Sequence, residues 1–208
     1  MGIDISKVFD LSKQFGKQNF RDVLAGTCKF KIVQVDMANE NDRKIVDSIT
    51  KAMNNFLNST KKSGTRYKGN RANDVGKKME TGIIEEMKKT PLKPTLLGSS
   101  GYPDLYIEHG IQKIYIELKT SAQKKKQDTH HRLFYFTSGK KINCDAHHLL
   151  LQIQIEEERD KYWQVISWQL RDLYNLKVSL KSEWNANYAD FENAGLLKEG
   201  MGNGNKKK

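Results

Sequence analysis

Two short segments with alternating apolar residues most constrain what this chain can fold into. Every second position is apolar in both of them, namely Leu105 and Ile107 in the first and Ile114, Ile116 and Leu118 in the second. Alternation of this kind is typical of strands that bury one face. Only a few residues around His109-Gly110 separate the segments, so the pattern predicts an antiparallel hairpin.

The same alternation decides where the polar side chains of the hairpin point. Residues two apart on a strand share a face, so Glu117 and Lys119 project together, opposite to Leu118. Asp104 follows Pro103 at the start of the first strand, and folding of the hairpin can bring its carboxylate close to Glu117. A solvated hairpin face is the alternative, because Asp, Glu and Lys are common on exposed strands.

Two carboxylates beside a lysine suit the chemistry of a hard divalent cation. Mg²⁺ prefers oxygen ligands and usually keeps several waters, so Asp104, Glu117 and the backbone carbonyl of Leu118 could form half of its shell. The cation would polarise a phosphoryl group and make water a better nucleophile. Lys119 would orient the water or offset negative charge that grows on the phosphoryl oxygens.

Pro103, Asp104, Glu117 and Lys119 match each fixed position of the signature of the PD-(D/E)XK nuclease superfamily, and the chain most resembles its type II restriction endonucleases. The resemblance implies an α/β fold with a restriction-endonuclease-like core, in which α-helices flank a mixed β-sheet. It also implies Mg²⁺-dependent hydrolysis of double-stranded DNA at a specific short site, leaving 5′-phosphate ends, with Mn²⁺ able to replace Mg²⁺. Alternatives are a structure-selective nuclease such as a Holliday-junction resolvase, and a non-catalytic DNA-binding protein.

The family places a further acidic residue on a helix upstream of the hairpin. An apolar stripe with helical spacing precedes it, formed by Val75, Met79, Ile83, Ile84 and Met87. Glu80 lies at the edge of this stripe and is the candidate helix acid, acting directly or through water. Glu86 also falls within the stripe, and Glu80 could instead be a boundary residue paired with Lys77. Asn73 or Asp74 is the expected helix cap.

Basic residues exceed acidic ones by 36 to 25, which gives a formal net charge of +11 and favours a polyanionic partner. They cluster before the helix and after the hairpin, so eight candidates for DNA binding are Arg66, Lys68, Arg71, Lys124, Arg132, Lys140, Lys141 and Asn143. Among these, Arg132, Lys140 and Asn143 carry donors that base edges in the major groove accept. Solvated charge is the alternative interpretation for each cluster.

The length of the chain suits one domain with a full core. We expect a single endonuclease domain over residues 1–200, with an N-terminal helical part at about 1–60 and a catalytic core at about 73–170, followed by a basic flexible tail at 201–208. Expected elements are a weak helix at 5–25, a strand at 28–36, a helix from an Asn39 or Asn41 cap to 57, a polar loop at 58–72, a helix at 73–87, and strands at 95–98, 133–136, 147–155 and 162–168.

The remaining expectations concern partners and location. A two-fold recognition site cut in both strands predicts a homodimer, and a restriction enzyme requires a cognate DNA methyltransferase in its host. Membrane-spanning and secretory patterns are missing from the sequence, so we expect a cytoplasmic protein without a membrane partner. Cys28 and Cys144 are expected to be reduced. Four histidines in two pairs, His130, His131, His147 and His148, are expected to pack or form hydrogen bonds rather than bind metal.

Overall fold

The computed structural model describes residues 16–98, 101–122, 132–136, 138–180, 184–187, 191 and 193–201. Within these ranges, no helix has the length and apolar character needed to cross a membrane.

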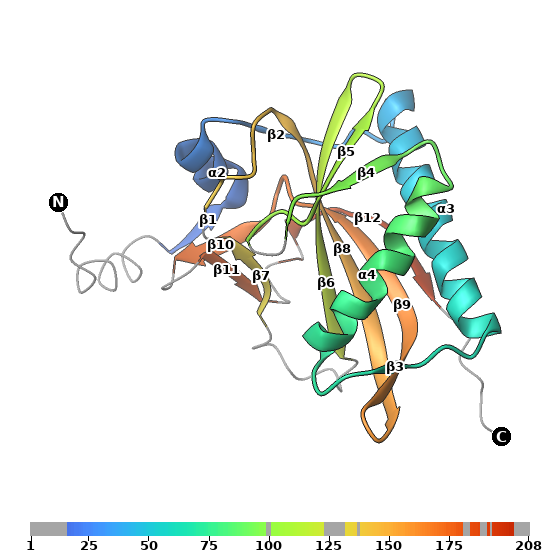
Figure 1. Cartoon of the computed structure of the whole chain (residues 1–208). Coiled ribbons are helices and arrows are strands. Elements are labelled where there is room, and N and C mark those ends of the chain that lie inside the picture. Colours follow the sequence, from blue (N-terminus) through green and yellow to red (C-terminus); the bar gives the residue numbers. More distant parts are fainter. Residues whose placement is uncertain are drawn as a thin grey trace.

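A mixed eight-stranded sheet forms the centre of the molecule (Figure 1). Its strands are β2 (Ile32–Val33), β3 (Tyr67–Lys68), β4 (Lys93–Leu96), β5 (Leu105–His109), β6 (Gln112–Ala122), β8 (Ala146–Arg159), β9 (Tyr162–Asp172) and β12 (Leu196–Met201). The order is β12-β9-β8-β6-β5-β4, with β2 paired to β8 and β3 paired to β9. Strands β2 and β6 run parallel to β8, whereas the other pairs are antiparallel.

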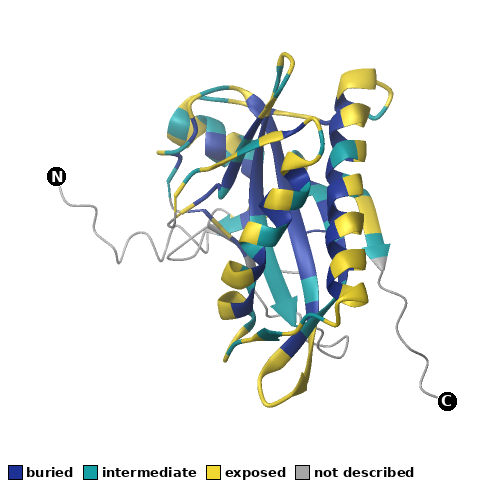
Figure 2. Ribbon diagram, turned by 45° about the vertical axis from the view of Figure 1, so that its right-hand side comes forward, coloured by how far each residue is buried: buried dark blue, intermediate teal, exposed yellow. Residues whose placement is uncertain are grey.

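Two long helices cover one face of this sheet, α3 (Glu40–Lys62) and α4 (Ala72–Lys88), as Figures 1 and 2 show. The predicted Asn39 cap is confirmed, since its side chain accepts hydrogen bonds from the backbone N–H groups of Asn41 and Asp42. Both helices bury one stripe, coloured dark blue in Figure 2, and expose the opposite side. The α/β class and the mixed sheet flanked by α-helices are therefore confirmed.

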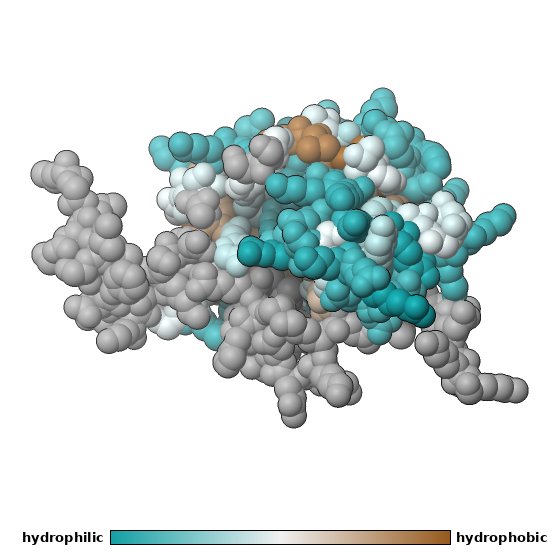
Figure 3. Space-filling model, turned by 60° about the horizontal axis from the view of Figure 1, so that its bottom comes forward, coloured by the Kyte–Doolittle hydropathy of each residue, from teal (hydrophilic) through white to brown (hydrophobic). Residues whose placement is uncertain are grey.

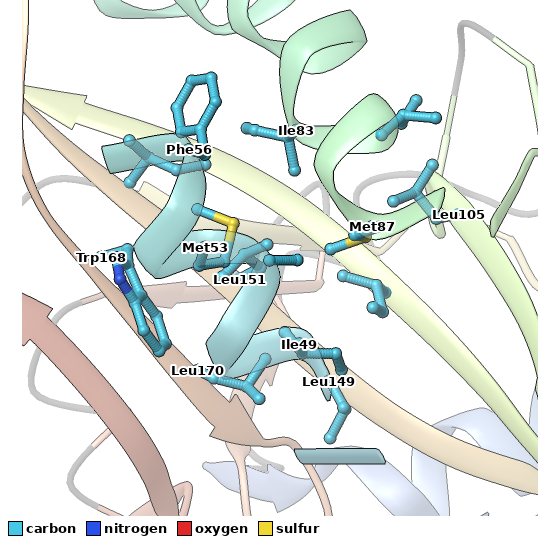
Figure 4. Close-up of a cluster of buried hydrophobic side chains, with 14 of the residues drawn as sticks. Ile49, Met53, Phe56, Ile83, Met87, Leu105, Leu149, Leu151, Trp168 and Leu170 are labelled. Carbon is cyan, nitrogen blue, oxygen red and sulfur yellow. The ribbon is translucent and has the colours of Figure 1, made fainter. Parts of the chain in front are cut away.

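The core between helices and sheet is formed by residues of α3, α4, β5, β6, β8 and β9 (Figure 4). Its members include Ile49, Met53 and Phe56 of α3, Ile83 and Met87 of α4, Leu105 of β5, Leu149 and Leu151 of β8, and Trp168 and Leu170 of β9. The five apolar residues predicted as the stripe of α4 are all buried here. Burial of this stripe fixes α4 against the sheet.

A second layer packs on the opposite face of the main sheet. It consists of α2 (Phe20–Cys28) and a four-stranded sheet of β1 (Lys17–Asn19), β10 (Lys177–Leu180), β11 (Trp184–Asn187) and β7 (Arg132–Phe136), in that order. Phe20, Phe134 and Phe136 bury their rings against Tyr102, and Tyr115 of β6 and Leu150 of β8 belong to the same cluster. Because neighbouring residues of β6 and β8 enter different clusters, the two cores lie on opposite faces of one sheet.

Several predicted boundaries in the N-terminal part were wrong. The expected helix at 5–25 is described only from Phe20 to Cys28, after strand β1, while residues 5–15 lie outside the description. Of the strand expected at 28–36, only Ile32–Val33 forms a strand. The short strands β1 and β2 form by pairing with the distant strands β10 and β8, which local patterns do not reveal.

The boundaries around α4 also differ from the prediction. Helix α3 continues to Lys62, and β3 interrupts the expected loop at 58–72. Helix α4 begins at Ala72 with Arg71 at the cap position, so Asn73 and Asp74 lie inside its first turn. Acidic Asp74 is favourable there because it faces the positive end of the helix dipole. The strand expected at 95–98 runs from Lys93 to Leu96, and of the tail only Met201 is described, at the end of β12.

Candidate active site

The predicted hairpin is present as β5 and β6, in antiparallel register from Leu105 opposite Ile116 to His109 opposite Gln112. Gly110, at the turn, has a φ of 61°, which glycine adopts without strain. Ile114 and Ile116 face the helices, whereas Tyr115 faces the second layer. Glu117 and Lys119 therefore share a face, as the alternation predicts.

Asp104 is fixed at the start of the hairpin by three hydrogen bonds. Its carboxylate oxygen Oδ2 accepts from the backbone N–H of Leu118 at 2.7 Å. Its own backbone N–H donates to the carbonyl oxygen of Ile116 at 3.1 Å, and its carbonyl oxygen accepts from the N–H of Leu97 at 2.9 Å. The side chain of Asp104 thus lies across β6 beside Glu117, and the negative charge of Asp104 raises the pKa of Glu117.

Glu117 is the buried acid of the group, with 3% of its surface exposed. Its Oε1 lies 2.7 Å from the ammonium of Lys119, while Oε2 is buried without a hydrogen-bond partner among the described atoms. Burial raises the pKa of Glu117 to about 7, and Asp104 adds to this effect, whereas Lys119 opposes it. A buried carboxylate oxygen with an unmet acceptor is energetically unfavourable unless a cation or donor satisfies it.

Lys119 links the hairpin to the second layer. Its ammonium lies 5.6 Å from the centre of the Tyr135 ring, which belongs to β7. About a quarter of the Lys119 side chain remains exposed, in contrast to its partner Glu117. The lysine therefore pairs with a buried carboxylate while remaining open to solvent, as a group that meets a substrate must.

Glu80 projects from α4 towards the same region but does not complete a cluster. Burial raises the pKa of Glu80, the negative charge of Asp104 raises it further, and Lys77 lowers it. Across the part of the chain that is described, His, Cys, Asp and Glu side chains nowhere form a group of three or more that could hold a metal ion. Glu80 is thus within electrostatic reach of Asp104 without joining it and Glu117.

The distance between α4 and β6 is set by Gly76. A Cβ atom at this position would lie 2.7 Å from Oγ1 of Thr120, which is closer than a Cβ atom comes to a neighbouring atom. Thr120 is the neighbour of Lys119 on β6, and Glu80 stands one turn after Gly76 on the helix. Glycine therefore lets the helix that carries Glu80 approach the strand that carries Lys119.

The residues present fit a hard divalent cation. Asp104 and Glu117 offer carboxylate oxygens on one face, and the carbonyl oxygen of Leu118 stands between Glu117 and Lys119 in the chain. The unpartnered Oε2 of Glu117 provides an acceptor that such a cation would satisfy. An oxygen-only set of this kind matches Mg²⁺, and Mn²⁺ after it, better than Zn²⁺, which favours nitrogen and sulfur.

Three predicted DNA-binding residues lie around β3 and the start of α4. Arg66 forms a two-pronged ion pair with Glu158 at the end of β8, at 2.5 and 2.8 Å. The Lys68 ammonium lies 5.5 Å from the ring centre of Tyr162, and Arg71 is exposed at the cap of α4. Figure 3 views the molecule from this end, and most of the coloured residues that it shows there are hydrophilic.

The predicted DNA-binding residues that follow the hairpin are only partly described. Lys124 lies outside the described residues, and of Arg132 only the backbone, in β7, is described. Lys140 is exposed in a turn. Asn143 accepts a hydrogen bond from the Tyr115 hydroxyl at 2.8 Å, which ties it to β6.

Lys141 has a different environment from its neighbour Lys140. Its ammonium donates to the carbonyl oxygens of Gly101 at 2.7 Å, Pro103 at 2.9 Å and Gly98 at 3.3 Å. These carbonyls belong to the segment that leads into Asp104. The sequence suggested a DNA contact for Lys141 and gave no sign of this arrangement.

A buried pair next to the site also escaped the sequence interpretation. The hydroxyl of Tyr102 and Nδ1 of His148 are 2.6 Å apart, and both side chains are buried. Burial lowers the pKa of His148 to about 3, so the ring is neutral. His147 makes a 3.1 Å contact from Nδ1 to the carbonyl oxygen of Val33. The predicted packing role of these two histidines is confirmed, whereas His130 and His131 lie outside the described residues.

Comparisons with known proteins place the chain in a family. The model of the type II restriction enzyme MjaV family matches residues 14–193. The type II restriction enzyme MjaV of Methanocaldococcus jannaschii is 29% identical over 203 residues, covering 87% of each chain. A solved structure of Archaeoglobus fulgidus Hjc, a Holliday junction resolvase, is 12% identical with a TM-score of 0.35, and covers 59% of this chain and 96% of that one. The match of the family model over most of the sequence shows that the chain belongs to the type II restriction enzyme MjaV family, a family of site-specific deoxyribonucleases.

Proposed function

We propose that this chain is a Mg²⁺-dependent type II restriction endonuclease that hydrolyses both strands of double-stranded DNA at a short specific site and leaves 5′-phosphate ends. Family membership supports a site-specific DNA nuclease. One observation carries the metal dependence, namely the buried Oε2 of Glu117, which lacks a partner among the described atoms although Asp104 and Lys119 are close by.

Asp104, Glu117 and the carbonyl oxygen of Leu118 would hold the cation. When bound, Mg²⁺ would supply positive charge that polarises the phosphoryl group and makes water more acidic. Glu117 must be ionised for this role, and Lys119 favours that state by lowering its pKa. Glu80, which stands apart from the other two carboxylates, would act through water rather than as a direct ligand.

Lys119 has two functions in this proposal. Before substrate arrives, its ammonium compensates the charge of the buried Glu117 at 2.7 Å. Because its side chain is also partly open to solvent, the same ammonium can meet a phosphate, orient the attacking water and offset charge that develops on the phosphoryl oxygens. A fixed donor of this kind needs no reorganisation during the reaction.

The partners follow from the same proposal. Double-stranded DNA would bind the positively charged regions that flank the site, through Lys68, Arg71 and Lys140, with Lys124 and Arg132 as candidates whose side chains are not described. A homodimer would match a two-fold recognition site. The host would carry a cognate methyltransferase that protects its own DNA, and the enzyme would act in the cytoplasm.

Cleavage of unmethylated phage DNA in Mg²⁺, with EDTA as the negative control, tests the proposal. Discrete bands that require Mg²⁺ and carry 5′-phosphate ends are expected for the parent and for Asp47→Asn, which removes an exposed carboxylate on α3. Asp104→Asn should leave the DNA intact. Retarded but uncut DNA would instead indicate a binding protein, and cutting confined to branched DNA would indicate a structure-selective nuclease.

A further inference from the structure

The ammonium of Lys141 is fully engaged by backbone carbonyls. A lysine ammonium carries three N–H donors, and Lys141 contacts three acceptors, the carbonyl oxygens of Gly98, Gly101 and Pro103. The last two distances, 2.7 and 2.9 Å, are those of good charge-assisted hydrogen bonds. Lys141 is also half-buried, unlike its exposed neighbour Lys140.

The carbonyls belong to the connection between β4 and β5, which ends at Asp104. Gly98 and Gly101 have φ angles of 92° and 77°, so the backbone there follows a path that only glycine adopts readily. Carbonyl groups of irregular backbone lack the partners that a strand would supply. Lys141 provides those partners, and Pro103, which it contacts, is covalently joined to Asp104.

Tyr102 attaches the same connection to the second core. Tyr102 contacts Nδ1 of His148 through its hydroxyl at 2.6 Å, and the two rings stack with centres 5.8 Å apart. Phe20 and Phe134 form T-shaped contacts with Tyr102, with ring centres 5.5 and 5.2 Å from the centre of the Tyr102 ring. The connection is thus anchored by Tyr102 in the second core and by Lys141 nearer the surface.

We propose that Lys141 is a positioning residue for the metal site, which holds the connection between β4 and β5 so that the Asp104 carboxylate stays beside Glu117. This inference rests on the proposed metal-dependent nuclease function. Lys141 follows β7 by a few residues, so the segment that was predicted to contact DNA is joined through this side chain to a predicted metal ligand. The positive charge of Lys141 also contributes to lowering the pKa of Glu117.

This role differs from a DNA contact in a way that can be measured. A lysine that binds phosphate or base edges affects DNA affinity and its salt dependence, and need not affect metal binding. A residue that orients a metal ligand affects metal affinity by about 10- to 100-fold when it is removed. The two roles therefore predict opposite outcomes for one substitution.

Lys141→Met removes the ammonium while keeping a long apolar side chain. Lys113→Met, at an exposed position of β6 remote from Asp104 in the hairpin register, removes the same charge and is the matched control. Lys141→Gln keeps an N–H donor and should be intermediate, which preserves the test if the Met variant does not fold. Three measurements compare them: Mn²⁺ binding by electron paramagnetic resonance, DNA affinity in EDTA, and amide hydrogen exchange of the metal-free proteins.

Lys141→Met is expected to weaken Mn²⁺ binding by about 10-fold or more, and the N–H groups of Leu97 and Asp104 should exchange faster while that of Leu151 in the core does not. DNA affinity in EDTA should match that of Lys113→Met. Unchanged Mn²⁺ binding and exchange, or a loss confined to DNA affinity, would overturn the inference. If the parent itself neither binds Mn²⁺ nor cuts DNA, the proposed function fails; if the parent does both and the variants of Lys141 behave like the control, only the positioning role fails.

Discussion

Glu117→Gln should remove the pH dependence of stability that the buried carboxyl group of Glu117 gives the metal-free protein. Burial raises the pKa of Glu117 from its ordinary value of 4.5 to about 7. A group whose pKa is raised on folding stabilises the fold below its unfolded pKa, and this contribution is lost as the pH rises through the folded pKa. At about 1.4 kcal/mol for each pH unit, the parent loses about 2 to 3 kcal/mol of unfolding free energy between pH 5 and pH 8 through this group.

Urea unfolding in EDTA at the two pH values measures the effect. Because the pKa of Asp172 is also raised by burial, the informative quantity is the difference between parent and Glu117→Gln. The variant should lose about 2 to 3 kcal/mol less than the parent on going from pH 5 to pH 8. Glu85→Gln, at an exposed position of α4, should follow the parent.

The same variant reports on metal binding. Mg²⁺ at about 100 times its dissociation constant should stabilise the parent by about 2.7 kcal/mol at pH 8, since the cation binds only the folded state. Glu117→Gln, which lacks the charge that would hold the cation, should gain little. Equal pH dependence in parent and variant, or equal stabilisation by Mg²⁺, would refute the placement of a buried metal ligand at Glu117.

Three further substitutions probe the neighbourhood of the site. Lys119→Met should lower the cleavage rate by about 100-fold or more while DNA binding is retained, as gel retardation beside a single-turnover assay would show. Gly76→Ala should lower the free energy of unfolding by about 1 to 3 kcal/mol, because its Cβ would lie 2.7 Å from Oγ1 of Thr120. In urea unfolding, the double variant with Thr120→Ala should regain part of this stability. An unchanged stability of Gly76→Ala alone would contradict the close approach of α4 and β6. Tyr102→Phe should lower the unfolding free energy by about 1 to 3 kcal/mol, because it leaves Nδ1 of His148 without its partner, and an unchanged urea midpoint would show that this contact contributes nothing.

The hairpin and its acidic and basic residues could be predicted because the signal is local. Alternation over β5 and β6 determines which side chains share a face, and the short connection at Gly110 determines which strands pair. Asp104, Glu117 and Lys119 could therefore be placed together from the sequence. The apolar stripe of α4 was equally visible, since helical periodicity needs no knowledge of distant partners.

The surroundings of the site could not be predicted because they depend on contacts between distant segments. Lys141 meets carbonyl groups about forty residues away, and Arg66 pairs with Glu158 across 92 residues. A lysine that donates hydrogen bonds to backbone carbonyl oxygens cannot be distinguished in a sequence from a lysine that binds phosphate. The contact between Tyr102 and His148 likewise joins residues 46 positions apart, which no short pattern encodes.

The rate of cutting at one mapped site, measured under single-turnover conditions over a range of Mg²⁺ concentrations, tests the metal-dependent site most directly. Parent enzyme should show a rate that rises with Mg²⁺, saturates and disappears in EDTA. Glu117→Gln should be slower by about 100-fold or more at every Mg²⁺ concentration while it still binds the same DNA. Cutting by the parent in EDTA, or by Glu117→Gln at the parental rate, would contradict the assignment of Asp104, Glu117 and Lys119 as one metal-dependent active site.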